Sequence, residues 1–214
     1  AIIGGTGSGK STLINLIPRL YDVNSGEVLV DGNDVRKYSL HDLHDKVAFV
    51  QQKAVLFKGT IRSNLLIGNP EATEEDMWKA LEIAQAKDFI SDLPDGLDAV
   101  VEQGGDIFSG GQKQRLAIAR AIIKPASIYV FDDSFSALDF KTDAKLRLAL
   151  RQDERISKAI IVIVAQRIST VTGADHIVVL DEGKVVGQGT HKELLADNTT
   201  YQEIVESQMK GAAI

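Results

Sequence analysis

The chain has 214 residues, of which 44% are apolar and 25% charged, and its formal net charge is −6. This composition is ordinary for a soluble globular protein, and its acidic balance argues against a nucleic-acid partner. The sequence has no cysteine, which excludes a disulfide framework and a thiolate metal site. No apolar run approaches the roughly 20 residues that a bilayer span needs, and no signal peptide is recognisable.

Apolar runs rich in β-branched residues alternate with helical patterns along the chain, which predicts an α/β fold with a mainly parallel sheet. A hairpin in the C-terminal part of the chain is expected in addition. A separate antiparallel β piece is expected near the N-terminus. The expected core strands are Ala1–Ile3, Val47–Val50, Ile128–Phe131 and Ile160–Val164, the hairpin joins His176–Leu180 to Lys184–Gly189, and the antiparallel piece includes Glu27–Val30.

Helical patterns follow the first glycine-rich loop and fill most of the middle of the chain. Thr73 and Asp76 have the spacing of a capping box, which predicts the start of a helix that continues to Ala86. The other expected helices are Thr12–Leu20, Gly111–Ile123 and Tyr201–Met209. We therefore expect one domain over residues 1–214, with a core at 1–60 and 124–214 and an inserted helical subdomain at about 61–123. Because Ala1 already lies inside a strand pattern, we also expect that part of the domain precedes it.

A glycine-rich loop after the first strand fits the phosphate-loop pattern G-x-x-x-x-G-K-[ST]. Its backbone N–H groups and the following helix N-terminus favour a bound phosphate. Lys10 is expected at the β- and γ-phosphates and Ser11 at Mg²⁺. The expected nucleotide-binding residues are Gly4, Gly5, Thr6, Gly7, Ser8, Gly9, Lys10, Ser11 and Thr12. The loop alone indicates a nucleoside triphosphate, and the absence of an N-K-x-D motif argues against GTP.

Phe108-Ser109-Gly110-Gly111-Gln112 closely resembles the LSGGQ signature of ATP-binding cassette (ABC) ATPases, with Phe in the first place. Taken alone, this segment could be a capped helix N-terminus. Further segments match the same family in the same order. They are Val50–Gln52 (the Q-loop), Leu56–Asn64 (an exporter-type stretch), Tyr129–Asp132 (Walker B), Ser136–Asp139 (the D-loop) and Ala165–Thr170 (the switch region).

The resemblance implies a P-loop NTPase fold that binds ATP with Mg²⁺ in a head-to-tail dimer of two cassettes. Each ATP would lie between the phosphate loop of one cassette and the signature of the other, here Ser109, Gly110, Gly111 and Gln112. The resemblance further implies that Ser11, Gln52 and Asp132 hold the metal and that Gln52 also acts in catalysis. It implies transmembrane domains as partners and a location at the cytoplasmic face of the cell membrane. The aromatic residue that the family stacks on adenine has no counterpart before the loop.

Two residues depart from the family pattern where it places its catalytic groups. Asp133 stands in place of the catalytic glutamate and Gln166 in place of the switch histidine. Aspartate is one methylene shorter, about 1.5 Å, and a misplacement of about 1 Å can cost roughly 10²-fold in rate. Glutamine can donate a hydrogen bond but cannot become cationic.

We therefore predict a slow ATP site in one half of a heterodimeric exporter. The alternatives are an ordinary ATPase with tolerated substitutions, a regulatory module that binds ATP without hydrolysing it, and a soluble ABC ATPase of translation or DNA repair.

Overall fold

The computed structural model describes residues 1–105 and 107–211. The chain divides into two compact units. The first unit contains Ala1–His44, Val130–Ser136 and Val162–Ile214, and the second contains Asp45–Tyr129 and Ala137–Ile161. The core and subdomain boundaries expected from the sequence stay a prediction.

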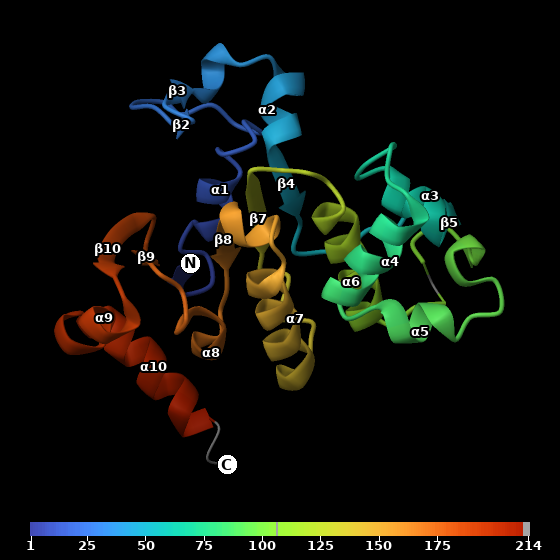
Figure 1. Ribbon diagram of the computed structural model, residues 1–214. Coiled ribbons are helices and arrows are strands. Elements are labelled where there is room, and N and C mark those ends of the chain that lie inside the picture. Colours follow the sequence, from blue (N-terminus) through green and yellow to red (C-terminus); the bar gives the residue numbers. More distant parts are fainter. Residues whose placement is uncertain (106, 212–214) are drawn as a thin grey trace. The chain divides into compact units, whose positions relative to one another are not determined.

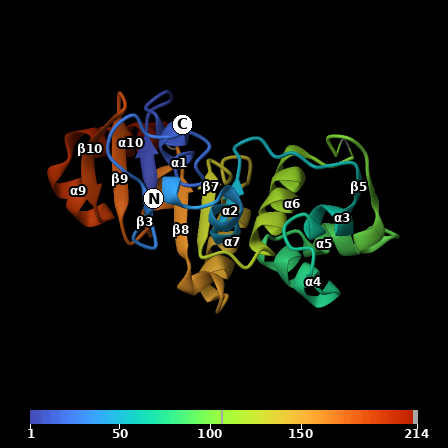
Figure 2. The same ribbon diagram turned by 90° about the horizontal axis from the view of Figure 1, so that it is seen from above.

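The central sheet has six strands in the order β10-β9-β1-β8-β7-β4. Strand β1 is parallel to both β8 and β9, whereas β10 is antiparallel to β9. The α/β fold with a mainly parallel sheet is therefore confirmed, and β10, β9 and β8 can be followed in Figure 2. The bounds are β1 Ile2–Gly4, β4 Val47–Val50, β7 Ile128–Asp132, β8 Ile160–Val164, β9 Ile177–Asp181 and β10 Lys184–Gly189.

Two tight hairpins have the turn residues that their sequences predict. Glu182 and Gly183, between β9 and β10, have φ of 45° and 76°. Asp31 and Gly32 have φ of 49° and 75° between β2 (Leu29–Val30) and β3 (Asn33–Asp34). Two successive positive φ angles are typical of type I′ turns, whose twist matches that of paired antiparallel strands.

The helix expected at Thr12–Leu20 is much shorter in the structure. Helix α1 comprises Lys10–Ile14, and the chain then continues in turns in which Ile17 N–H bonds to the carbonyl of Ile14. Pro18 follows, and it lacks the N–H group that a helix interior needs. The prediction was wrong because it gave the apolar periodicity more weight than this proline.

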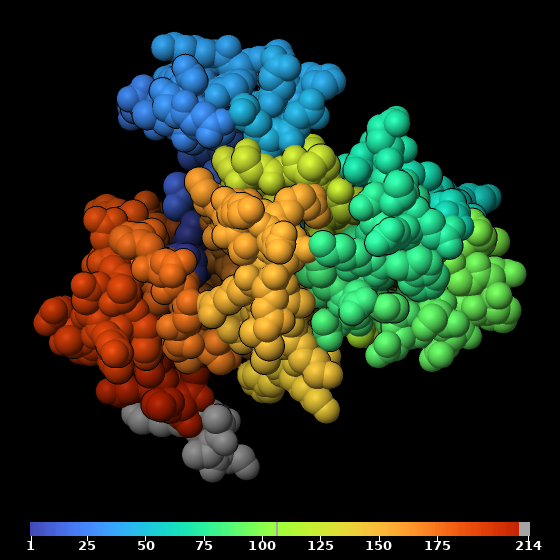
Figure 3. Space-filling model, viewed as in Figure 1, coloured from blue at the N-terminus to red at the C-terminus, as the bar shows by residue number. Residues whose placement is uncertain are grey.

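The remaining helices of the first unit follow β8 and the hairpin. They are α8 Ile168–Val171, α9 His191–Asp197 and α10 Thr199–Gly211. In Figure 1, α9 and α10 lie beside the hairpin of β9 and β10, and in Figure 3 these four elements form one continuous orange-red region. A short 3-10 helix, Val35–Lys37, precedes α2 (Leu40–Lys46).

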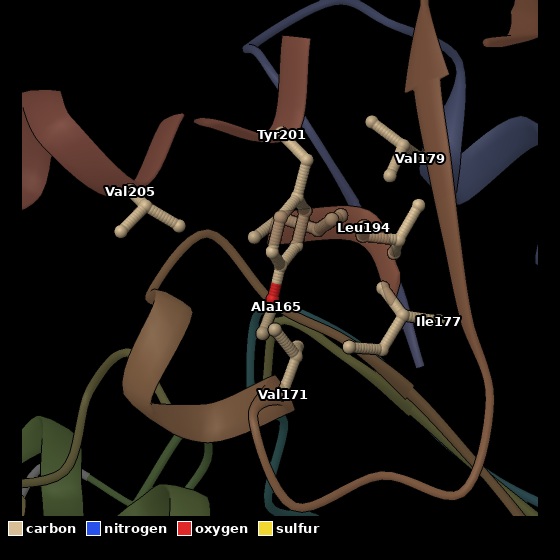
Figure 4. Packing of buried hydrophobic residues seen from close by; sticks show 8 residues of the cluster. Ala165, Val171, Ile177, Val179, Leu194, Tyr201 and Val205 are labelled. Atoms are coloured by element: carbon tan, nitrogen blue, oxygen red, sulfur yellow. The ribbon is translucent and has the colours of Figure 1, made fainter. Parts of the chain in front are cut away.

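A buried apolar cluster holds α8, α9 and α10 to the strands of the first unit (Figure 4). Tyr201 of α10 is fully buried in it, and its hydroxyl lies 2.8 Å from Nδ1 of His191 at the start of α9. The cluster comprises Ile3, Ala165, Val171, Ile177, Val179, Leu194, Tyr201 and Val205.

The second unit is mostly helical, and it contains the middle helices that the sequence predicts. Thr73 caps α4 through a capping box, in which Thr73 N–H bonds to Asp76 Oδ2 at 2.9 Å, as expected. The elements are β5 Gly59–Thr60, α3 Ile61–Leu66, α4 Glu74–Ile83, α5 Lys87–Ser91, β6 Val100–Val101, α6 Gly110–Ile122 and α7 Phe140–Gln152, with 3-10 turns at Gly96–Asp98 and Ile156–Lys158. Within residues 1–105 and 107–211, none of the helices combines the length and apolar character that a bilayer span needs.

Tyr201 provides a test of the packing of α10. Tyr201→Phe keeps the ring and loses the hydroxyl contact with His191, so we expect a loss of about 1 kcal/mol in the free energy of unfolding. Tyr201→Ala also leaves a cavity and should cost roughly 3 kcal/mol or more. Urea denaturation of both variants measures this difference.

Tyr21→Ala is the control, because Tyr21 is 62% exposed and its replacement should change stability little. A loss for Tyr201→Ala no larger than that for Tyr21→Ala would contradict the packing of α10.

Candidate functional site

The glycine-rich loop of residues 4–12 lies between β1 and α1. A Cβ atom at Gly4 would overlap the carbonyl oxygen of Leu180 on the neighbouring strand β9, so only glycine fits this strand end. Gly9 has φ of 95°, a left-handed conformation that glycine adopts without strain. The loop therefore takes its shape from positions that require glycine.

The ammonium group of Lys10 lies inside this loop. Its Nζ atom donates hydrogen bonds to the carbonyl oxygens of Gly4 at 2.9 Å and Gly5 at 2.6 Å, and to Ser8 Oγ at 3.3 Å. Burial lowers the pKa of Lys10, and the two carboxylates at the end of β7 oppose this shift. The oxygens that hold Nζ in place are uncharged, so the cation keeps its attraction for an anion that enters the loop.

Ser11 and Asp132 form a pair of oxygen ligands next to Lys10. The Ser11 hydroxyl donates to Oδ1 of Asp132 at 2.9 Å, and Asp132 is the last residue of β7. Burial raises the pKa of Asp132, and the bond from Ser11 partly offsets that rise.

A hydroxyl and a carboxylate oxygen fit Mg²⁺, which prefers hard oxygen ligands. Among the described residues no group of three or more His, Cys, Asp or Glu could hold a metal. Because Mg²⁺ usually takes one or two carboxylates and fills its shell with waters and substrate phosphates, the pair of Ser11 and Asp132 is compatible with such a site.

Asp133 and Gln166, the two candidate catalytic residues at the ends of β7 and β8, contact each other. Gln166 Nε2 donates to Asp133 Oδ2 at 2.8 Å. The backbone of Asp133 has φ of 46°, and its N–H bonds to the carbonyl of Val164, the last residue of β8. Aspartate tolerates this left-handed region better than most residues. The amide of Gln166 therefore fixes the direction of a carboxylate that is already buried at 6% exposure.

Gln208 was not expected from the sequence. Its side-chain amide donates to the carbonyl of Gln166 at 2.6 Å and accepts from the N–H of Ile168 at 2.8 Å. The helical pattern over residues 201–209 predicts the helix, but nothing in that pattern indicates which segment the helix contacts.

The signature segment belongs to the second unit and caps α6. Ser109 Oγ accepts from Gln112 N–H at 3.3 Å, while Gln112 Oε1 accepts from Ser109 N–H at 2.9 Å. Ser109 and Gly110 are exposed, and a Cβ at Gly110 would meet no atom within 4 Å. An exposed N-terminus of a 13-residue helix, with small residues in its first turn, can bind an anion.

The candidate residues thus fall into two groups. In the first unit, Ser11 bonds directly to Asp132 and Gln166 to Asp133, and the two carboxylates interact electrostatically with Lys10. In the loop of this unit Gly5, Thr6, Gly7 and Thr12 are exposed and Ser8 is buried. Gln52, which is exposed and follows β4, lies with Ser109–Gln112 in the second unit.

Comparison with known proteins identifies the family of the chain. The family model described as ABC transporter matches residues 1–136. An uncharacterized ABC transporter ATP-binding protein of Mycobacterium tuberculosis H37Rv is 53% identical over the whole chain. A putative multidrug export ATP-binding/permease protein of Staphylococcus aureus NCTC 8325 is 43% identical over 97% of it.

A solved structure shows the same fold. It is a bacterial Atm1-family ABC exporter with ATP bound, and it matches 97% of the chain with a TM-score of 0.93 and 37% identity. The chain spans 37% and 36% of the lengths of the two relatives and 36% of the exporter chain. The chain therefore belongs to the ABC transporter family.

Proposed function

We propose that this chain is the ATP-binding and ATP-hydrolysing cassette of an exporter, with a slow site of its own and a signature that completes the site of a partner cassette. The observation that carries the proposal is the direct contact of Gln166 with Asp133, next to the pair of Ser11 and Asp132. These contacts support a metal-binding role for the oxygens of Ser11 and Asp132 and a proton-accepting role for the carboxylate of Asp133.

The candidate site residues of the first unit have separate roles in this proposal. The loop N–H groups and Lys10 bind the β- and γ-phosphates, and Ser11 and Asp132 hold Mg²⁺. When bound, Mg²⁺ neutralises charge on these phosphates. Asp133 orients the attacking water and accepts its proton while the γ-phosphoryl group passes from ADP to the water oxygen.

The expected slowness follows from the two substitutions. The carboxylate of Asp133 is one methylene short of a glutamate, about 1.5 Å, and one of its oxygens already accepts from Gln166. Gln166 has no titratable proton, so it can neither become cationic beside the γ-phosphate nor transfer a proton. Both effects lower the rate and leave ATP binding to Lys10 and the loop.

The same contact also supports a second reading, in which the chain is a regulatory module that holds ATP with almost no hydrolysis. If the amide of Gln166 holds the carboxylate of Asp133 where no water can reach the carboxylate, Asp133 cannot activate a water molecule, and ATP stays bound without being hydrolysed. The two readings differ in the rate at which the chain's own site hydrolyses ATP.

The cellular setting is part of the proposal. The relatives named for multidrug export and for the Atm1 family support an exporter with transmembrane domains, located at the cytoplasmic face of the cell membrane. The asymmetry between a slow site and an intact signature favours a heterodimer. The exporter-type stretch Leu56–Asn64 argues against a soluble ABC ATPase of translation or DNA repair.

The substitutions can be reversed together. We expect Asp133→Glu/Gln166→His to raise single-turnover ATP hydrolysis at least tenfold, because it restores the length of the base and a titratable partner, and each typically contributes about 10²-fold or more. Hydrolysis is measured with radiolabelled ATP at saturating Mg²⁺, with the chain alone and with a partner cassette.

Asp133→Asn is the matched control, since asparagine suits the left-handed backbone at this position but cannot accept a proton. It should bind ATP normally and lose the remaining hydrolysis. Unchanged turnover in the double variant, with ATP still bound, would refute the slow-site proposal. If Asp133→Asn hydrolysed ATP as fast as the parent chain, that result would favour the regulatory module.

The composite site predicts complementation between two inactive variants of this chain. Lys10→Ala damages the phosphate loop, and Gly110→Asp places a charge on the signature at a position where a side chain has room. Each variant alone should be inactive. An equal mixture should recover about a quarter of the parental turnover, because half of randomly formed dimers are mixed and each has one complete site of two.

Steady-state ATPase assays on the separate and mixed variants measure this recovery. Gly110→Ala, which adds a methyl group and no charge, controls for the effect of bulk at the signature. A mixture as inactive as its components, although the parent is active and dimeric, would show that the signature does not act on a second chain's nucleotide.

A further inference from the structure

Gln208 makes a pair of hydrogen bonds to the backbone of the switch segment, residues 165–168. Its Nε2 donates to the carbonyl of Gln166 at 2.6 Å, and its Oε1 accepts from the N–H of Ile168 at 2.8 Å. One side-chain amide thus satisfies a backbone acceptor and a backbone donor two residues apart, as a peptide group of a neighbouring strand would.

Gln208 is held in this position by the packing of its helix. Tyr201, Val205 and Gln208 are spaced by four and three residues on α10, so they lie on one helix face. Tyr201 is fully buried and Val205 is 7% exposed, and both belong to the apolar cluster that contains Ala165 (Figure 4). The same face of α10 therefore packs on Ala165, the residue before Gln166, and bonds to the backbone of Gln166 and Ile168.

The geometry points to a role for this contact in the ATP site. We propose that Gln208 is a positioning residue, which fixes the backbone at Gln166 so that the side chain at position 166 reaches Asp133 and the γ-phosphate. This inference rests on the proposed function for its effect on turnover. The clamp itself is a statement about the backbone of residues 166–168 and can be measured without hydrolysis.

The side chain of Gln166 depends on this backbone because its reach is fixed. Its Nε2 lies 2.8 Å from Asp133 Oδ2, within the range of a good hydrogen bond. A shift of about 1 Å in the backbone would break that contact, and misplacements of this size can change rates by roughly 10²-fold. Losing Gln208 removes two of the bonds that hold the segment in place.

Gln208→Ala and Gln208→Met test the clamp by hydrogen exchange. Methionine keeps nearly the length and volume of glutamine but cannot make either bond, so it separates hydrogen bonding from packing. In both variants of the full 214-residue chain we expect the Ile168 amide to exchange about 3- to 10-fold faster, as loss of one net hydrogen bond predicts.

Gln202→Ala is the matched control. Gln202 lies on the same helix and its side chain also donates to backbone carbonyls, those of Leu195 at 2.8 Å and Ala196 at 3.3 Å, but these belong to α9. Its replacement should leave Ile168 exchange unchanged. Equal acceleration in Gln202→Ala and Gln208→Met would show a general loosening of α10 and would overturn the clamp.

The effect on turnover is measured as a separation of kcat from KM. We expect Gln208→Met to lower kcat about 3- to 10-fold with KM for ATP nearly unchanged, and Gln202→Ala to change neither. The same loss should persist in Asp133→Glu/Gln166→His, because Gln208 bonds to the backbone at position 166 and not to its side chain. A merely structural role would lower stability in both helix variants and leave kcat unchanged.

The outcomes separate the two proposals. If the parent chain hydrolyses no ATP, with or without a partner cassette, the proposed function fails, and the exchange of Ile168 alone decides whether the clamp exists. If the parent is active and Gln208→Met changes neither Ile168 exchange nor kcat, the role of Gln208 is refuted while the proposed function stands.

Discussion

The carboxyl ends of β1, β7 and β8 meet at one edge of the sheet, and the candidate site of the first unit depends on this meeting. Ile2 of β1 is in register with Val164 of β8, and the carbonyl of Val164 accepts the N–H of Asp133 just after β7. Each strand then delivers one part of the site, namely the glycine loop, the two aspartates and the switch segment. Ligands in open α/β sheets bind at this edge, because parallel strands present their loops there together.

Charged side chains at this edge of the sheet are buried, and burial disfavours their charged forms. Lys10 and Asp132 are both buried. Burial lowers the pKa of Lys10 and raises the pKa of Asp132, and each shift favours the neutral form of the side chain. The two carboxylates Asp133 and Asp132 oppose the shift at Lys10, and the hydrogen bond from Ser11 opposes the shift at Asp132, whereas the neighbouring Asp133 adds to it.

Much of this fold was predictable because local chemistry and tertiary packing agree. The strands Val47–Val50 and Ile160–Val164 have the bounds that their apolar runs predict, and the capping box at Thr73 starts α4 as expected. The helix after the glycine loop is the exception, since Pro18 ends a periodicity that its neighbours continue. The contact of Gln208 with the switch segment was not predictable, because it joins residues 42 apart through packing that no local pattern encodes.

The cap of α6 bears on how the signature could bind an anion. The oxygen of the Ser109 hydroxyl already accepts the N–H of Gln112, which satisfies one of the unpaired donors at the helix end. A hydroxyl that accepts one hydrogen bond still has its proton to donate. Ser109 could therefore donate a hydrogen bond to a phosphate oxygen while it still caps the helix. Binding of an anion at this end of α6 would then require no unwinding of the first turn.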